Sequence, residues 1–173
     1  ERLCAAGAVI LDIEIPEIAQ ANHALITIVQ SEASLIHESL LPQNPEGYAP
    51  LTRAQIEAGR AVPAIEYVRA MRQCAVIGSA LEAVFATVDV LASPTVPFVA
   101  PESDPQMEDG DGELLSCGVA NVTGHPAISL HAGVSEGLPV GLQLIGRHGH
   151  DAGLLAAAAA IEATLGSAPR PPL

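Results

Sequence analysis

The chain has 173 residues, of which 49% are hydrophobic, so it is long and apolar enough to fold as one domain with its own core. Its formal net charge is −13 and its seven Lys and Arg positions are all Arg, which makes a phosphate backbone or an anionic membrane surface an unfavourable partner. Three scattered Cys without a CxxC pair favour neither a disulfide framework nor a zinc knuckle. We therefore expect a cytoplasmic protein that binds no nucleic acid and no membrane.

The first part of the chain alternates between helical and extended patterns. Residues 1–6 have the composition of a last helical turn, and Gly7 is suited to end it. Residues 8–15 are first apolar and then alternate with acids, which predicts a strand. Pro16 suits the first turn of a new helix, and apolar residues recur at spacings of three and four over residues 17–41.

The middle of the chain predicts two more helices. The Pro, Asn and Gly content of residues 42–50 indicates a loop. Residues 52–55 (TRAQ) fit a capping box, which predicts a short helix that ends near Gly59. Pro63 can occupy the first turn of a longer helix that continues to about Thr87.

The last part of the chain predicts three strands and two helices. We expect short strands at residues 88–92, 126–132 and 140–145, a long acidic loop over 95–112, and a helix over 113–122. The last two strands are joined by a loop too short for a helical crossover, so they should pair antiparallel. Asp151 is suited to cap a helix over 152–165, which Gly166 would end. Strands separated by helices predict an α/β fold with a mixed sheet flanked by helices.

Three segments together are similar to one known family. They are Asp89 to Pro97 (DVLASPTVP), Asn121 to Leu130 (NVTGHPAISL) and Gly137 to Arg147 (GLPVGLQLIGR). Their order and spacing resemble the C-terminal region of amidase-signature hydrolases, and the third segment is the most specific. The stretch from Ala6 to Pro16 resembles a segment found earlier in that family, so the resemblance spans nearly the whole chain.

The resemblance implies where the chemistry of the full protein resides. In the family a serine nucleophile is activated through a second serine, held in a cis peptide, and a lysine, while a Gly/Ser-rich loop supplies N–H groups for the oxyanion. Those residues lie upstream of the region matched here, and this chain contains no Lys and no Gly-Gly-Ser-Ser loop. Residues 1–173 are therefore expected to be the C-terminal portion of a single amidase-signature domain of α/β/α fold, with no catalytic residue and no activity alone.

The resemblance also implies a substrate pocket. Carried over position by position, four residues are expected to line it: Thr95, Ser116, Cys117 and Asn121. The chain departs from the family pattern at this point. Ser116, Cys117 and Val119 stand where a bulky apolar residue, Thr and Pro are expected, and His131 stands where Pro is expected. The alternative for these residues is a role in packing alone.

Other polar clusters do not indicate a site. The run HGHD over residues 148–151 is best interpreted as a surface turn before a helix, since zinc requires three or four convergent ligands. The acidic run from Glu108 to Glu113 lacks the Gly and the final Glu of a calcium loop. No Gly-x-Ser-x-Gly elbow supports a Ser–His–Asp triad. We therefore predict no metal and no cofactor.

Two classes of function remain open. In the first, the full-length protein hydrolyses a small-molecule amide, with a homodimer as one arrangement, and this chain supplies scaffold and pocket. In the second, the chain is a stand-alone, non-catalytic binding or assembly module, or part of an amidotransferase subunit that works with partner proteins. A module that is complete in itself should not expose a broad apolar face.

Overall fold

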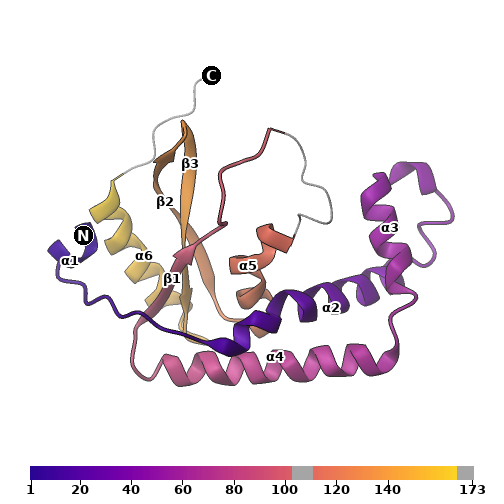
Figure 1. Cartoon of the computed structure of the whole chain (residues 1–173), viewed down its shortest axis with the longest axis horizontal. Helices are drawn as coiled ribbons and strands as arrows, with labels where there is room; N and C mark the ends of the chain where they lie inside the picture. The colour runs from indigo at the N-terminus through magenta and orange to yellow at the C-terminus, as the bar shows by residue number, and fades with distance from the viewer. Residues whose placement is uncertain (103–110, 167–173) are drawn as a thin grey trace.

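Six helical segments precede the first strand in the described chain, and the small sheet lies between α6 on one side and α4 and α5 on the other (Figure 1). This computed structural model describes residues 1–102 and 111–166. The elements, in chain order within these residues, are α1 (Arg2–Ala5), η1 (Pro16–Gln20), α2 (Ala21–Ile36), η2 (Pro45–Gly47), α3 (Pro50–Gly59), α4 (Ala64–Val84), β1 (Val90–Pro94), α5 (Asp111–Thr123), β2 (Ala127–Ser135), β3 (Leu138–Gly146) and α6 (Asp151–Leu165).

The three described strands form one antiparallel sheet in the order β1-β3-β2. β2 and β3 form a hairpin in which Ser135 pairs with Leu138. Its two turn residues, Glu136 and Gly137, have φ angles of 55° and 82°. Two successive positive φ angles give a turn whose twist matches that of the strands, so the hairpin closes more tightly than the loop of residues 133–139 expected from the sequence.

One face of the sheet packs against α6. Leu130 and Leu144 from the sheet meet Leu154 and Ala158 from the helix in one apolar cluster. Gly146 allows this close approach, because a Cβ atom there would lie 3.0 Å from the Cβ of Leu154. The alternating apolar residues of β2 and β3 thus fix which face of the sheet receives the Ala-rich helix.

The opposite face of the sheet packs against α4 and α5, with α2 beyond them. Ile77 and Leu81 of α4 are completely buried, and they meet Val119 of α5 and Ile145 of β3. Phe85 closes this cluster at the end of α4. The long helix predicted after Pro63 therefore carries the main core of the described chain.

The α/β class, the β2–β3 hairpin and the helices were expected from the sequence. A mixed sheet was expected too, but both pairs among the described strands are antiparallel, and some local details were wrong. α3 begins at Pro50, so Thr52 lies inside the helix and forms no capping box. Proline at the first position has no N–H that needs a cap, which lets the helix start earlier. Asp151 is the first residue of α6 and not its N-cap, although its carboxylate still complements the helix dipole.

The strand predicted over residues 8–15 is not formed in the described chain. The segment runs between α1 and η1 (Figure 1) as an irregular stretch that pairs with none of the described strands. A strand requires a hydrogen-bonding neighbour, which its own sequence cannot supply. β1 is present but begins and ends two residues later than the expected range of 88–92.

Candidate functional site

The face of the sheet that α5 covers is polar in one half. Ser93 of β1 and Ser129 of β2 both pair with Gln143 of β3, which lies between them. Residues directly opposite in an antiparallel sheet project to the same face, so these three side chains form a row across all three strands. The apolar pair Leu91 and Ile145 lies on the same face, two residues further along, against α4 and α5.

Gln143 joins this row of side chains to α5, which packs against this face of the sheet. Its side chain is 5% exposed, and its amide donates to the Ser116 carbonyl at 2.9 Å and to the Ser93 hydroxyl at 3.4 Å. A buried amide is costly unless it is hydrogen-bonded, so these contacts hold β3, β1 and α5 in one arrangement. Ser116 therefore enters the site through its backbone carbonyl.

Thr95 and Ser129 form a hydroxyl pair at the partly exposed end of the row. The two Oγ atoms lie 2.5 Å apart, and the Thr95 amide donates to the Gly141 carbonyl at 2.9 Å. Gly141 leaves room for the pair, because a Cβ atom there would lie 2.5 Å from the Thr95 hydroxyl and 2.7 Å from the Ser129 hydroxyl. This close approach explains a glycine in the middle of a strand.

Cys117 and Asn121 approach the hydroxyl pair from α5. The Cys117 thiol donates to the Thr95 carbonyl at 3.3 Å, which ties the helix to the residue that follows β1. The Asn121 amide donates to the Cys117 carbonyl at 2.9 Å within the helix and is exposed. Thr95, Ser116 and Cys117 thus meet at one place, while Asn121 lies one helical turn away.

The arrangement supports binding better than nucleophilic chemistry. Within the described chain, the Thr95 and Ser129 hydroxyls bond to each other, and neither has a hydrogen-bonded base beside it. A hydroxyl needs such a base to act as a nucleophile. Each hydroxyl can still donate to a carbonyl oxygen or accept from an amide N–H.

A second polar cluster lies where α4, α5 and the β3–α6 turn meet. His125 is buried, and its Nε2 lies 3.2 Å from a Glu82 carboxylate oxygen, while its Nδ1 lies 2.9 Å from the Thr123 hydroxyl. The ring of His148 packs edge-on against that of His125, with 4.7 Å between the two ring centroids. Arg147 donates to the second oxygen of Glu82 at 3.2 Å.

Electrostatics explain the protonation of this cluster. Burial, and then the neighbouring charge of His148, lower the pKa of His125, although the Glu82 carboxylate acts in the opposite direction. Burial alone would raise the pKa of Glu82, but the His148 N–H, Arg147 and His125 together bring it below its usual value. At neutral pH the His125 ring is therefore neutral, and it lies beside the ionised carboxylate of Glu82, which accepts several hydrogen bonds. No group of three or more His, Cys, Asp or Glu side chains suited to a metal occurs among residues 1–102 and 111–166.

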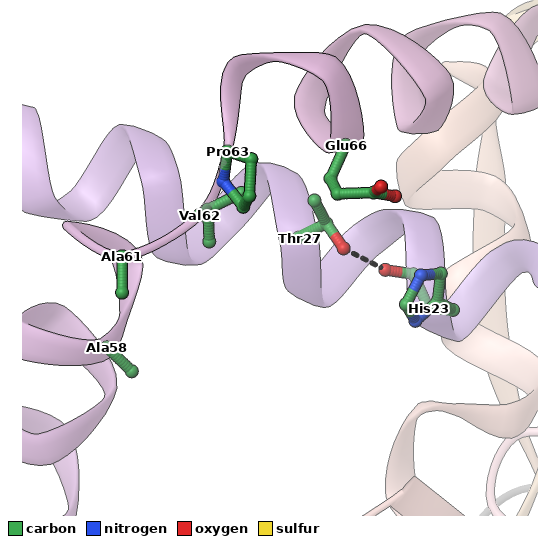
Figure 2. Close-up of a pocket in the computed structure, with 7 residues that line it drawn as sticks. All are labelled: His23, Thr27, Ala58, Ala61, Val62, Pro63 and Glu66. Carbon is green, nitrogen blue, oxygen red and sulfur yellow. Dashed lines mark hydrogen bonds between the residues drawn. The ribbon is translucent and has the colours of Figure 1, made fainter.

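A shallow hollow of about 380 Å³ lies elsewhere, beside α2 and the start of α4 (Figure 2). Thr27 bonds to the His23 carbonyl at 2.8 Å inside α2, and Val62 and Pro63 of the α3–α4 connection form the opposite wall. None of the four predicted pocket residues lines this hollow. It therefore adds no support to the pocket expected from the sequence.

Comparison with known proteins shows the family. A family model described as amidase matches residues 1–155, and the chain belongs to this family. A fatty acid amide hydrolase from Medicago truncatula is 32% identical over 180 residues, which cover 96% of this chain and 29% of the relative. An amidase from Pseudomonas putida is 31% identical over 139 residues, covering 75% of this chain and 30% of the relative.

A solved structure supports the same assignment. A crystal structure of an amidase matches with a TM-score of 0.84 and 29% identity, over 95% of this chain and 39% of that chain. The fold described above is thus a portion of the amidase-signature fold. The chain spans less than a third of the length of the two curated relatives. No helix in the described ranges is both long and apolar enough to span a membrane.

The sequence missed four residues of the polar site: Ser93, Ser129, Gly141 and Gln143. All four lie inside the segments that carry the family resemblance, but nothing there distinguished them from residues that shape the sheet. Along β2 and β3, polar residues or glycine alternate with apolar residues, and this alternation was the signal in the sequence that they share one face of the sheet. Only the register of the strands places them next to Thr95.

Proposed function

We propose that the complete protein is an amidase that hydrolyses the carboxamide bond of a small molecule. Residues 1–173 form the C-terminal portion of its single domain and supply scaffold and substrate pocket. The serine, the cis-peptide serine and the lysine of the reaction lie upstream. The observation that carries the proposal is the family match over residues 1–155 of a chain that has no Lys and spans 39% of a solved amidase.

The pocket in this proposal is built on the hydroxyl pair. Thr95 is one member of this pair, and the Cys117 thiol of α5 donates to its backbone carbonyl. Ser116 joins α5 to β3 through Gln143, and Asn121 lies one helical turn after Cys117. Paired hydroxyls can hydrogen-bond both the carbonyl and the N–H of an amide, which supports a substrate of that class. The three described Cys are free thiols, which fits a reducing cytoplasm.

The test is amide hydrolysis by the complete polypeptide. Ammonia release from a panel of aliphatic and aromatic carboxamides should require the upstream region, and the 173-residue chain should give only the background rate. Replacing the upstream lysine by Ala should lower kcat by about 10³-fold or more, because the serine then lacks its base. Hydrolysis by the 173-residue chain alone, or an upstream region without Lys and a Ser-rich loop, would refute the proposal.

A second function is favoured by one observation. One subunit of the glutamyl-tRNA(Gln) amidotransferase from Streptococcus gordonii is 46% identical over 85 residues, although these cover only 47% of this chain. In this alternative the complete protein is an amidotransferase subunit that works with partner proteins. A partner that co-purifies with it, and an amide transfer that needs this partner, would decide in its favour.

A further inference from the structure

One buried histidine has no role in the proposed pocket. His125 lies between the end of α5 and the start of β2, and its side chain is closed off from solvent. Both ring nitrogens have partners, since Nε2 lies 3.2 Å from a Glu82 carboxylate oxygen and Nδ1 lies 2.9 Å from the Thr123 hydroxyl. Phe85 packs against the same ring, with 5.6 Å between the ring centroids. An imidazole can take up a proton in mild acid, so this buried group can alter its surroundings when the pH changes.

The residues that contact His125 also hold the β3–α6 turn (residues 147–150) in place. Arg147 donates to one Glu82 carboxylate oxygen at 3.2 Å, and the His148 amide donates to the other oxygen, also at 3.2 Å. The His148 ring donates from Nε2 to the Thr123 carbonyl at 3.0 Å. Glu82 belongs to α4 and Thr123 to α5. The turn is therefore tied to both helices through the two residues that bond to His125.

The Thr123 hydroxyl lets the His125 ring take up a proton without losing a partner. This hydroxyl lies 2.8 Å from the Val119 carbonyl and 2.9 Å from Nδ1, and it has a single hydrogen to donate. Beside the neutral ring, the hydroxyl donates to Nδ1 while Nε2–H donates to Glu82. Beside the protonated ring, Nδ1–H donates to the hydroxyl oxygen, and the hydroxyl turns to the Val119 carbonyl. His125 can therefore become charged in its buried position.

The charges around Glu82 are balanced only while both imidazoles are neutral. The groups that face one another are Glu82 from α4, His125 after α5, Arg147 and His148 from the turn, and the uncharged Thr123 from α5. At neutral pH the positive charge of Arg147 matches the negative charge of Glu82. Protonation of the two rings, whose centroids are 4.7 Å apart, would surround one carboxylate with an excess of positive charge. Like charges this close repel each other.

The turn is the part of this cluster that can yield. The side chain of Arg147 is 57% exposed and residues 147–150 are all exposed, whereas the side chain of His125 is fully buried. Water can replace the partners of an exposed group at little cost, but it cannot replace those of a buried group. Excess positive charge should therefore move Arg147 and His148 away from Glu82 and leave the pair of His125 and Glu82 in place.

We propose that Glu82, Thr123, His125, Arg147 and His148 form a pH-sensitive latch, which holds the β3–α6 turn on α4 and α5 at neutral pH and releases it in mild acid. We call these residues the histidine latch. The turn leads directly into α6, which covers one face of the sheet, so the latch determines how firmly the start of α6 is held. The proposal does not depend on the proposed function, because every residue of the latch lies in the described chain.

The pKa values of the two buried partners support the direction of the response. Burial, and then the charge of His148, lower the pKa of His125 below its ordinary value of about 6.5. Burial acts to raise the pKa of Glu82, but the bonds from the His148 amide, Arg147 and His125 hold it below its ordinary value. The latch is thus closed above about pH 6.5 and is lost as the pH falls through the lowered pKa of His125, while Glu82 stays ionised.

Hydrogen exchange of the complete polypeptide at pH 7.5 and 5.5 tests the latch, once each rate is divided by the intrinsic rate at that pH. The His148 amide donates to Glu82 and should lose protection by about 10-fold or more in acid. The Leu144 amide lies in β3, which is paired on both sides, and should keep its protection. This measurement needs no variant.

Two histidine replacements separate the latch from other titrating groups. His125→Gln removes the titrating ring, so the protection of the His148 amide should be the same at both pH values. His150→Gln is the matched control, because it replaces an exposed histidine of the same turn, and it should keep the wild-type response. Independently of any variant, the Cε1–H resonance of His125 should titrate over the pH range in which the protection is lost.

Each outcome decides for or against the latch. Equal protection of the His148 amide at both pH values in the wild type would overturn the proposal, as would a loss that persists in His125→Gln. A loss of equal size in β3 would show a general destabilisation instead of a released turn. A His125 ring that titrates outside the range of the loss would also contradict the latch. Amide hydrolysis enters none of these measurements, so the latch and the proposed function are tested separately.

Discussion

At the scale of single residues, Gln143 shows how one buried amide can organise a site. It contacts Ser116 of α5 and Ser93 of β1 while its own strand runs between β1 and β2. Removing a buried amide leaves the groups it bonded without partners, which is the expensive part of the change. The Ser93 hydroxyl and the Ser116 carbonyl should therefore lose the same donor together.

Replacing Gln143 tests this role. We expect Gln143→Leu to lower the free energy of unfolding by about 1–3 kcal/mol in urea titrations, because the Ser116 carbonyl loses its buried donor. Gln20→Leu is the control at an exposed glutamine and should change it by less than about 0.5 kcal/mol. Equal effects of the two replacements would show that the buried contacts of Gln143 contribute nothing.

His125 makes stability depend on pH. Its folded pKa is lowered by burial, so the unfolded chain binds more protons in the window between that value and the ordinary value of about 6.5. Stability conferred by the neutral ring is thus complete above about pH 6.5 and falls as the pH drops through this window. The lowered pKa of Glu82 also contributes to the free energy of unfolding, but this contribution is lost only at more acidic pH, as the pH falls below the ordinary pKa of a carboxylate.

This dependence can be measured by urea unfolding at pH 7.5 and 5.5. The wild type should lose stability between these two pH values, and His125→Gln should lose clearly less, since the titrating ring is gone. His150→Gln, at an exposed histidine, should retain the wild-type difference. If His125→Gln responds to pH as strongly as the wild type, another group is responsible.

At the scale of elements, glycines decide how closely helices approach. Gly59, at the end of α3, lies where a Cβ atom would overlap the Gln30 carbonyl and the Ser34 hydroxyl of α2. The Ser34 hydroxyl also donates to the Ile56 carbonyl, so the two helices are joined at this point. The sequence indicated only that Gly59 ends a helix. The packing of α3 against α2 gives a second reason for a glycine at this position.

Two alanine substitutions test this difference. Gly59→Ala should destabilise the chain by about 2 kcal/mol or more, because backbone must move to admit the methyl group. Gly153→Ala in α6 meets nothing within 4 Å and should stabilise by about 0.5–1 kcal/mol through helix propensity. Thermal unfolding of both variants checks the prediction, and a shift of the same sign in the two would contradict it.

At the scale of the whole molecule, exposed apolar side chains weigh against a self-sufficient module. Val9, before η1, is 83% exposed; Leu35 and Ile36 of α2 are 73% and 67% exposed, and Leu155 of α6 is 59% exposed. Where exposed apolar side chains adjoin one another, they usually mark an interface. The stand-alone module that the sequence left open required a surface without a broad apolar face.

This surface predicts the behaviour of the chain in solution. The 173-residue chain should bind a hydrophobic dye such as ANS and should associate further as its concentration rises, because its apolar side chains meet water. The complete polypeptide at the same concentration should bind much less dye. Comparable, low dye binding in both samples would favour the stand-alone module.

The sequence by itself determined the class of fold, the helices, the hairpin and the family. Apolar periodicity and the Gly and Pro that end elements are local signals, and the three quoted motifs are contiguous stretches of chain. Only the tertiary structure decided which polar residues meet. Ser93, Thr95, Ser129, Gly141 and Gln143 come together through strand register, and register depends on partners distant in sequence. The same reason explains the strand that failed to form over residues 8–15, because a strand needs a second segment to pair with and none of the described strands pairs with these residues.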